Sequence, residues 1–174
     1  MQIFATFHSP VKSALALDDR RARKAIIEAA QILSTVLYSR APLHVRSRLY
    51  KPVALRPVIT WPGERRANYL WLVQHYEALG VRYLHSSGRQ HATIDRLPPS
   101  FFKELAALVP AGGFTDPPNA TENQRYAVSF KHVKDVYRAY RLYLQARWRI
   151  EMETHIYKPA IHVSVGRLHE FYDV

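Results

Sequence analysis

The chain has 174 residues, and its 48% hydrophobic and 12% aromatic content excludes a disordered protein, because that much apolar surface offsets the entropy lost on folding. Lys and Arg number 25 against 14 Asp and Glu, so the net charge of +11 favours a polyanion as partner, nucleic acid before an anionic membrane. Cysteine is absent, which excludes disulfides and thiolate chemistry, and we expect a soluble protein because no apolar run has the length of a membrane span.

Two helices are predicted within the first 38 residues. Ser9 followed by Pro10 is typical of an N-cap with proline in the first turn, and it predicts a short helix over 11–17. Over 19–38 the apolar residues recur every three or four positions, which predicts a helix of about five turns. Four prolines within 39–63 then predict an irregular or partly extended segment that no regular helix can cross.

The middle of the chain predicts two further helices. Apolar residues on one side of 64–79 predict a helix, and Gly80 is a natural C-terminal stop. Two prolines at the start of 98–109 predict another helix, which a turn-rich loop over 110–118 follows.

The last predicted helix is long and covers 132–153. Beyond Pro159, the alternation of apolar residues predicts a short strand or an extended tail. Together these patterns predict a mainly α fold: a single compact helical domain over residues 1–174 with proline-rich irregular loops.

A row of polar residues interrupts the otherwise apolar second helix. Arg20, Lys24, Glu28 and Gln31 are spaced three and four apart and therefore share one side of it. One interpretation is a solvated stripe with a Lys24–Glu28 ion pair that contributes only tenths of a kcal/mol. The other is a cleft wall, where cations keep Asp19 or Glu28 ionised as a general base that activates water.

Aromatic residues alternate with cations and an amide in the next part of the chain. This mixture suits a flipped or single-stranded base, which is held by stacking while its edge is read by hydrogen bonds. The competing interpretation is that Tyr69 and Trp71 are core and surface residues of a helix. The residues concerned are Tyr50, Lys51, Arg56 and Trp61, followed by Glu64, Asn68, Tyr69 and Trp71.

The motifs of metal and nucleotide cofactor sites are absent from the sequence. It contains no HExxH, GxxxxGK[S/T], GxGxxG or GxSxG pattern. His155, His162 and His169 are seven residues apart, but Pro159 and Gly166 interrupt the spacing. We therefore expect neither a metal nor a cofactor.

Several of these patterns occur together in small phage-associated proteins, which the chain resembles over most of its length. The matching residues are Met1-x-Ile3-Phe4, Asp19-Arg20-Arg21-x-x-Lys24-x-x-x-Glu28-x-Ala30-Gln31, Tyr50-Lys51-Pro52, Trp61, Glu64, Asn68-Tyr69-x-Trp71, Gly88-x-x-His91, Pro110-x-Gly112-Gly113-Phe114 and Tyr137-Arg138-x-Tyr140. In that family Asp-Lys-His usually stands at Asp19-Arg20-Arg21, and histidines follow the proline near residue 52, where this chain has Ala54 and Arg56. Roles of those histidines therefore do not carry over.

The phage-associated family is similar to helical proteins that act on hypermodified bases in phage DNA, some of them related to DNA glycosylases. The resemblance implies a monofunctional glycosylase that excises a modified base, for example glucosylated hydroxymethylcytosine, in defence against phage. Asp19 is the first choice for its catalytic carboxylate and Glu28 the second, with Lys24 beside them. The residues expected to hold DNA are Arg20, Arg21, Gln31, Tyr50, Lys51, Arg56, Trp61, Asn68, Tyr69, Trp71 and His91.

Two other functions fit the same residues. A base-hypermodifying transferase or pyrophosphorylase would use the same flipped nucleotide with a second substrate. A non-catalytic DNA-binding protein would need only the basic surface. All three imply DNA as the partner, a cytoplasmic location and no obligate protein partner.

Overall fold

The computed structural model describes residues 1–154 and is mainly helical, which confirms the predicted fold class. Helix α1 (Pro10–Leu15) begins after Ser9, whose hydroxyl accepts a backbone N–H of the first turn. Helix α2 (Asp19–Tyr38) begins in the same way after Asp18. Both helices lie where the sequence predicts them, because each has a side-chain cap and a regular apolar face.

The proline-rich segment 39–63 is crossed by no continuous helix, as predicted, but it contains two short helices that the sequence does not predict. They are α3 (Leu43–Arg46) and α4 (Pro57–Glu64). Pro57 stands at the first position of α4, where its missing N–H is not needed. Pro62 lies inside α4 and costs a backbone hydrogen bond, which is offset because most side chains of this helix are buried.

Helix α5 (Arg66–Ser87) continues past Gly80, so the predicted stop there is wrong. A Cβ at this glycine would lie 2.9 Å from Cδ1 of Ile94 in α6 (Ala92–Arg96). The absent side chain thus allows close packing of α5 against α6 rather than ending the helix. The helix ends at Gly88, which has φ 69° and adopts the left-handed cap conformation.

The predicted helix over 98–109 is found as two consecutive pieces. Helix α7 (Pro99–Glu104) continues into a 3₁₀ helix (Leu105–Leu108). The following loop over 110–118 has no regular secondary structure, as its glycines and prolines predict.

A small antiparallel hairpin precedes the last helix and was not predicted. Strands β1 (Glu122–Asn123) and β2 (Val128–Ser129) flank a 3₁₀ turn (Gln124–Tyr126). Ala127 closes the turn with φ 50°, a left-handed conformation that a non-glycine residue rarely adopts.

Helix α8 (Val136–Glu153) starts four residues later than predicted. Asp135 is its N-cap, because its carboxylate accepts the backbone N–H groups of Tyr137 and Arg138. The predicted strand or tail beyond Pro159 lies outside the described residues.

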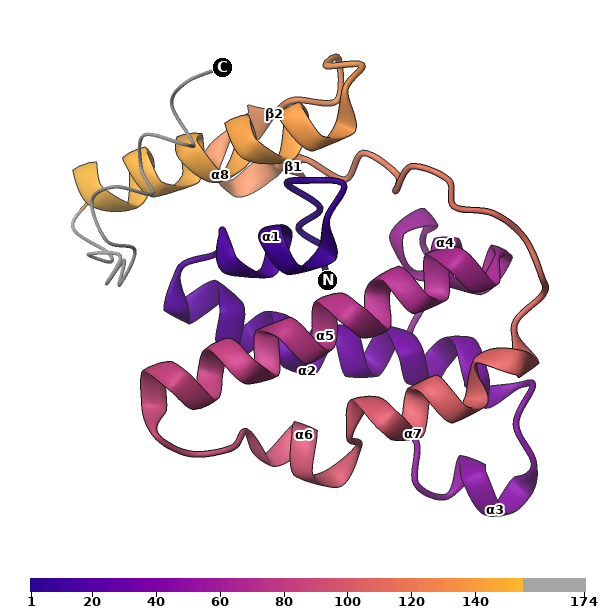
Figure 1. Cartoon of the computed structure of the whole chain (residues 1–174). Coiled ribbons are helices and arrows are strands. Elements are labelled where there is room, and N and C mark those ends of the chain that lie inside the picture. Colours follow the sequence, from indigo (N-terminus) through magenta and orange to yellow (C-terminus); the bar gives the residue numbers. More distant parts are fainter. Residues whose placement is uncertain (155–174) are drawn as a thin grey trace.

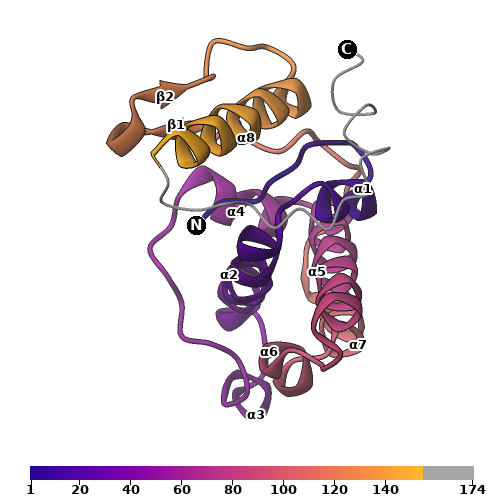
Figure 2. The same ribbon diagram turned by 90° about the vertical axis from the view of Figure 1, so that its left-hand side faces the viewer.

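Helices α2 and α5 pack side by side through the middle of the molecule (Figure 1). Helix α1 packs on α5, and α4 packs on both α2 and α5. Helix α8 and the hairpin lie above this layer, whereas α3 lies at the opposite end (Figure 2).

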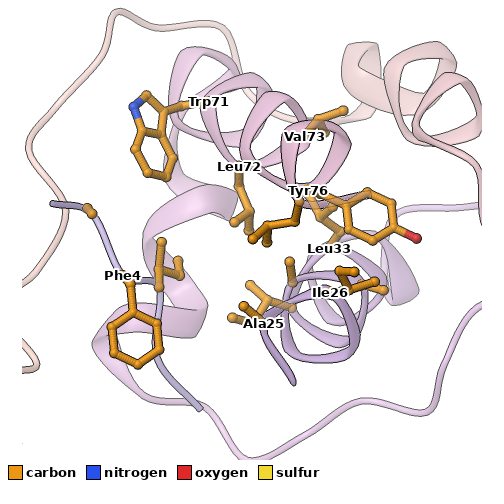
Figure 3. Close-up of a cluster of buried hydrophobic side chains, with 14 of the residues drawn as sticks. Phe4, Ala25, Ile26, Leu33, Trp71, Leu72, Val73 and Tyr76 are labelled. Carbon is orange, nitrogen blue, oxygen red and sulfur yellow. The ribbon is translucent and has the colours of Figure 1, made fainter. Parts of the chain in front are cut away.

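The hydrophobic core lies mainly between α2 and α5. Aliphatic and aromatic side chains of the two helices meet there and are almost fully excluded from solvent (Figure 3). The facing side chains include Ala25, Ile26 and Leu33 from α2 and Leu72 and Tyr76 from α5.

Within the described residues, no helix combines the length and the apolar character needed to cross a membrane.

Candidate functional site

A cleft of about 780 Å³ lies where the first residues of the chain, α2 and the start of α4 meet α8 and the hairpin. This volume is in the range of pockets that hold small organic ligands. Its lining is strongly basic, with seven Lys and Arg side chains against three Glu. The cations are Arg20, Arg21, Lys24, Arg56, Arg125, Lys131 and Arg147, and the anions are Glu28, Glu122 and Glu151.

Glu28 provides a largely buried carboxylate in the cleft wall formed by α2. The backbone N–H of Gln2 donates to Glu28 Oε2 at 3.3 Å, and Nζ of Lys24 lies 3.4 Å from Oε1. The ammonium group of Met1 lies 3.9 Å from the same oxygen. The structure therefore brings Glu28 and Lys24 together in a concave, basic environment.

Asp19 is directed elsewhere and is not among the cleft residues. Its Oδ1 accepts a hydrogen bond from Nη2 of Arg82 at 3.1 Å. The same guanidinium donates to the carbonyls of Ala14 and Leu15 at the end of α1. Asp19 thus joins α2 to α1 and α5, and the two candidate carboxylates of the sequence are separated.

The remaining predicted residues of α2 divide in the same way. Arg20 and Arg21 line the cleft, whereas Gln31 does not. Gln31 is half-buried, and its backbone carbonyl accepts the hydroxyl of Thr35. The polar row is therefore a cleft wall only over its first turns.

Arg21 joins the two walls of the cleft through a buried ionic network. Its guanidinium donates to Asp18 Oδ2 and to Glu151 Oε1, each at 2.6 Å, and Nε1 of Trp148 donates to Asp18 at 2.8 Å. Burial by itself would raise the pKa of Asp18, but Arg21 and the hydrogen bonds outweigh it and lower that pKa. Burial likewise would lower the pKa of Arg21, but Asp18 and Glu151 raise it.

The α8 wall holds polar atoms that have no hydrogen-bond partner among the described residues. These are Oε2 of Glu151 and Nε of Arg147, both buried. Arg147 also donates to Glu151 Oε1 at 2.8 Å and covers the ring of Tyr126 at 4.2 Å from its centroid. Sequence reasoning missed this wall, although the i,i+4 spacing of Arg147 and Glu151 is the signal of an ion pair on one helix face.

The predicted base-stacking residues of α4 and α5 are instead buried in the core. Nε1 of Trp61 donates to Thr115 O at 3.1 Å, and the Asn68 amide holds the N–H and hydroxyl of the same threonine at 2.9 Å each. The Trp71 indole donates to His8 O. These residues and the equally buried Tyr69 do not line the cleft. Their polar atoms have hydrogen-bond partners within the fold, which is typical of core residues.

The loop residues are distributed between two places. Arg56 is exposed and lines the cleft. Lys51 is also exposed but is not among the cleft residues. Tyr50 lies instead under the guanidinium of Arg96, 4.6 Å from its ring centroid, near α6. His91 caps α6, because its Nδ1 accepts the backbone N–H of Thr93.

Among residues 1–154, no group of three or more His, Asp or Glu side chains is arranged to hold a metal ion. His155, His162 and His169 lie outside the described residues. Comparisons with protein-family models, with curated proteins and with solved structures give no match to this chain. The function is therefore inferred from the chemistry of the cleft.

Proposed function

We propose that this protein is a DNA glycosylase that hydrolyses the N-glycosidic bond of a modified base held in the basic cleft. The observation that carries the proposal is the position of Glu28. It is a largely buried carboxylate held by Lys24 in a wall of a cleft whose other charged groups are mostly cations. Such a carboxylate can orient water and stabilise positive charge on a sugar.

Binding would begin with the DNA phosphates. Lys24 and Arg56 are exposed cations at the cleft, and Arg125 and Lys131 stand on the side of the hairpin. Neutralising phosphates with these groups releases counterions, so affinity should fall steeply with salt. The cleft is large enough to accept one extruded nucleotide, whose base is out of reach inside a duplex.

In the chemical step, the bond between C1′ and the base nitrogen breaks, and the base leaves with its electron pair. Glu28 stabilises the positive charge that develops on the sugar and accepts a proton from water as the water oxygen bonds to C1′. The released base gains a proton from solvent. Lys24 is paired with Glu28 and is thus a poor nucleophile, which favours simple hydrolysis without strand nicking.

The resemblance to phage-associated proteins supports a modified DNA base as the substrate. Excision of such bases would attack the genome of a phage that carries them, and this role requires a location in the cytoplasm. The basic lining of the cleft also suits the phosphates that flank any target base.

The test is incubation of the protein with genomic DNA from phages that carry different modified bases, followed by mass spectrometry. We expect a free modified base together with abasic sites, and loss of both products for Glu28→Gln. An altered nucleoside left within the strand would instead indicate a base-modifying enzyme. Unchanged DNA in every case would contradict catalysis.

A non-catalytic DNA-binding protein is the second candidate, and the burial of Trp61, Tyr69 and Trp71 favours it. Without these rings, Tyr126 and Tyr143 are the aromatic residues left in the cleft lining apart from Phe4. A binding protein needs no ionised carboxylate, so the Glu28→Gln variant would still bind DNA and would keep any protection against phage. Loss of that protection with DNA binding retained would exclude this candidate.

A further inference from the structure

We propose that Arg48 and Arg96 form a second phosphate-binding face, which holds a second DNA duplex while the cleft holds the first. The inference goes beyond base release and rests only on the proposed binding of DNA at the cleft. A protein with two such faces bridges two duplexes.

The two arginines lie side by side between α3 and α6. Arg48 follows the end of α3, and Arg96 is the last residue of α6. The guanidinium of Arg48 covers the ring of Phe101 at 4.3 Å from its centroid, and that of Arg96 covers the ring of Tyr50 at 4.6 Å. Nη2 of Arg96 also donates to the backbone carbonyl of Arg48 at 3.3 Å, so the two residues are direct neighbours.

The rings orient the guanidinium groups and leave most of their donors open. Stacking uses the flat face of a guanidinium, whereas its N–H groups point outward from the edge. Among residues 1–154, the hydrogen bond from Arg96 to the Arg48 carbonyl is the one that these two side chains make. Because the side chains are already held in place, a ligand that binds them costs little additional rotamer entropy.

The charge of this face is not neutralised within the described part of the chain. Arg48 and Arg96 are both exposed, and no ion pair engages either of them there. Lys51 is exposed on the same segment as Arg48. Asp95 and Glu104 are the carboxylates of α6 and α7, and neither makes an ion pair among the described residues. Neighbouring open guanidinium groups are suited to phosphate oxygens, which accept their paired N–H groups.

The same face lacks the apolar surface that a membrane would need. On α3, α6 and α7, Leu43 is the large hydrophobic residue that the described structure leaves in solvent. A helix that lies on a membrane buries a whole apolar face in the lipid, whereas DNA phosphates need only cations. The combination of open cations with a lone leucine therefore favours DNA over an anionic membrane.

The second face and the cleft lie at opposite ends of the molecule. Helices α3 and α6 lie at one end, and α8 with the hairpin, which form one wall of the cleft, lies at the other (Figure 1 and Figure 2). Neither Arg48 nor Arg96 lines the cleft. A duplex much shorter than the persistence length of DNA is stiff and cannot bend around the protein to reach both ends. A short duplex in the cleft therefore leaves the second face open to another.

The test is capture of a second duplex. An unmodified duplex of about 20 base pairs is fixed to beads and saturated with protein, free protein is washed away, and a fluorescent duplex of the same sequence is added. We expect capture that falls steeply with salt. Arg48→Ala/Arg96→Ala should bind the fixed duplex as well as the unaltered protein does but capture the second roughly tenfold more weakly. The slope of log capture affinity against log salt should fall by about two.

Arg138→Ala/Arg149→Ala is the matched control. It removes the same charge from two exposed positions of α8 that do not line the cleft. This variant should keep full capture of the second duplex. Arg48→Lys/Arg96→Lys keeps the charge but not the planar group above each ring, so it should recover only part of the capture that alanine loses.

Three outcomes would overturn the second face. The first is no capture by the unaltered protein. The second is unchanged capture by Arg48→Ala/Arg96→Ala, because two copies of the chain would then join the duplexes through their clefts. The third is a competition in which phosphatidylserine vesicles remove the captured duplex more effectively than free duplex does, which would identify a membrane as the partner.

Base release separates this inference from the proposed function. Capture uses unmodified DNA and requires no chemical step. If the protein releases base but captures no second duplex, the second face is wrong and the glycosylase stands. If capture depends on Arg48 and Arg96 but no base is released, the second face stands on a DNA-binding protein.

Discussion

The cleft and the aromatic cluster of Trp61, Asn68 and Trp71 both contain polar atoms, but the two regions differ in whether these atoms have hydrogen-bond partners. In the cluster, the Trp61 and Trp71 indoles and the Asn68 amide all find partners inside the fold. In the cleft, Oε2 of Glu151 and Nε of Arg147 have none among the described residues. Buried polar atoms without a partner also occur away from the cleft, at Thr6 Oγ1, Ser34 Oγ and His75 Nε2, so we take an open polar atom as a sign of a ligand site only where it belongs to a residue that lines the cleft.

The chemical reason for the difference is the number of partners that each group requires. An indole has a single donor, so one backbone carbonyl allows a tryptophan to be buried. A carboxylate or guanidinium needs several partners and loses hydration when buried, so it stays at a surface or within a network. The aromatic cluster should therefore determine stability, and the cleft should determine binding.

The largest expected effect on stability is that of Trp61→Ala in the cluster. Truncation of this buried ring should lower the free energy of unfolding by about 3–5 kcal/mol, because it leaves a cavity and unpairs Thr115 O. Denaturant unfolding followed by circular dichroism would measure it. A loss below about 1 kcal/mol would show that the cluster is not part of the core.

The next effect is a dependence of stability on pH, due to His75. This histidine stacks on Trp71, donates from Nδ1 to Pro10 O, and has no partner for its buried Nε2 among the described residues. Burial lowers its pKa to about 4, although the bond to Pro10 acts in the opposite direction.

Between about pH 4 and 6.5 the folded state keeps His75 neutral, whereas the unfolded chain binds a proton at this side chain. The free energy of unfolding is therefore at its full value above about pH 6.5. It falls by on the order of 3 kcal/mol as the pH decreases toward 4. Unfolding curves between these pH values would measure the slope, and His75→Phe should reduce it. An equal slope in the variant would contradict burial of a neutral histidine.

A smaller loss is expected for Asn68→Ala. The variant leaves the backbone N–H of Thr115 and the carbonyl of Trp61 unpaired, at a cost of about 1–3 kcal/mol. Thermal unfolding would measure the loss of stability as a fall in the melting temperature. Asn68→Asp is the informative companion, because it keeps the acceptor for Thr115 but loses the donor to Trp61.

The smallest effect on stability is expected in the cleft. Lys24→Ala and Arg56→Ala should each change the free energy of unfolding by less than about 0.5 kcal/mol, because both side chains are exposed. Each should nevertheless weaken DNA binding and reduce the slope of log affinity against log salt by about one. Unchanged slopes in both variants would contradict the proposed binding of DNA at the cleft.

The sequence predicts the long helices well, because capping and apolar period are local properties. Asp18 and Asp135 cap their helices through their own side chains, but only the α2 cap lies where periodicity alone predicts the start. Gly80 does not end α5, because a glycine that ends a helix and a glycine that admits a neighbouring side chain look the same in sequence. The distinction depends on Ile94, which belongs to the next helix, α6.

The candidate site was only half predictable for the same reason. A Glu and a Lys in an apolar helix indicate a surface, and Lys24 and Glu28 do lie in the cleft. The opposite wall comes from Arg147 and Glu151, more than 100 residues away, and no local pattern pairs them with α2. Trp71 was ambiguous because aromatic residues suit both a core and a binding surface.

The most direct test of the account compares Glu28→Gln with Asp19→Asn in single-turnover base release from modified phage DNA. Glu28 lies in the cleft, and Asp19 pairs with Arg82 outside it. We expect Glu28→Gln to slow release by about a hundredfold or more while binding is kept, and Asp19→Asn to retain nearly the full rate. Loss of release in Asp19→Asn with activity preserved in Glu28→Gln would contradict the account.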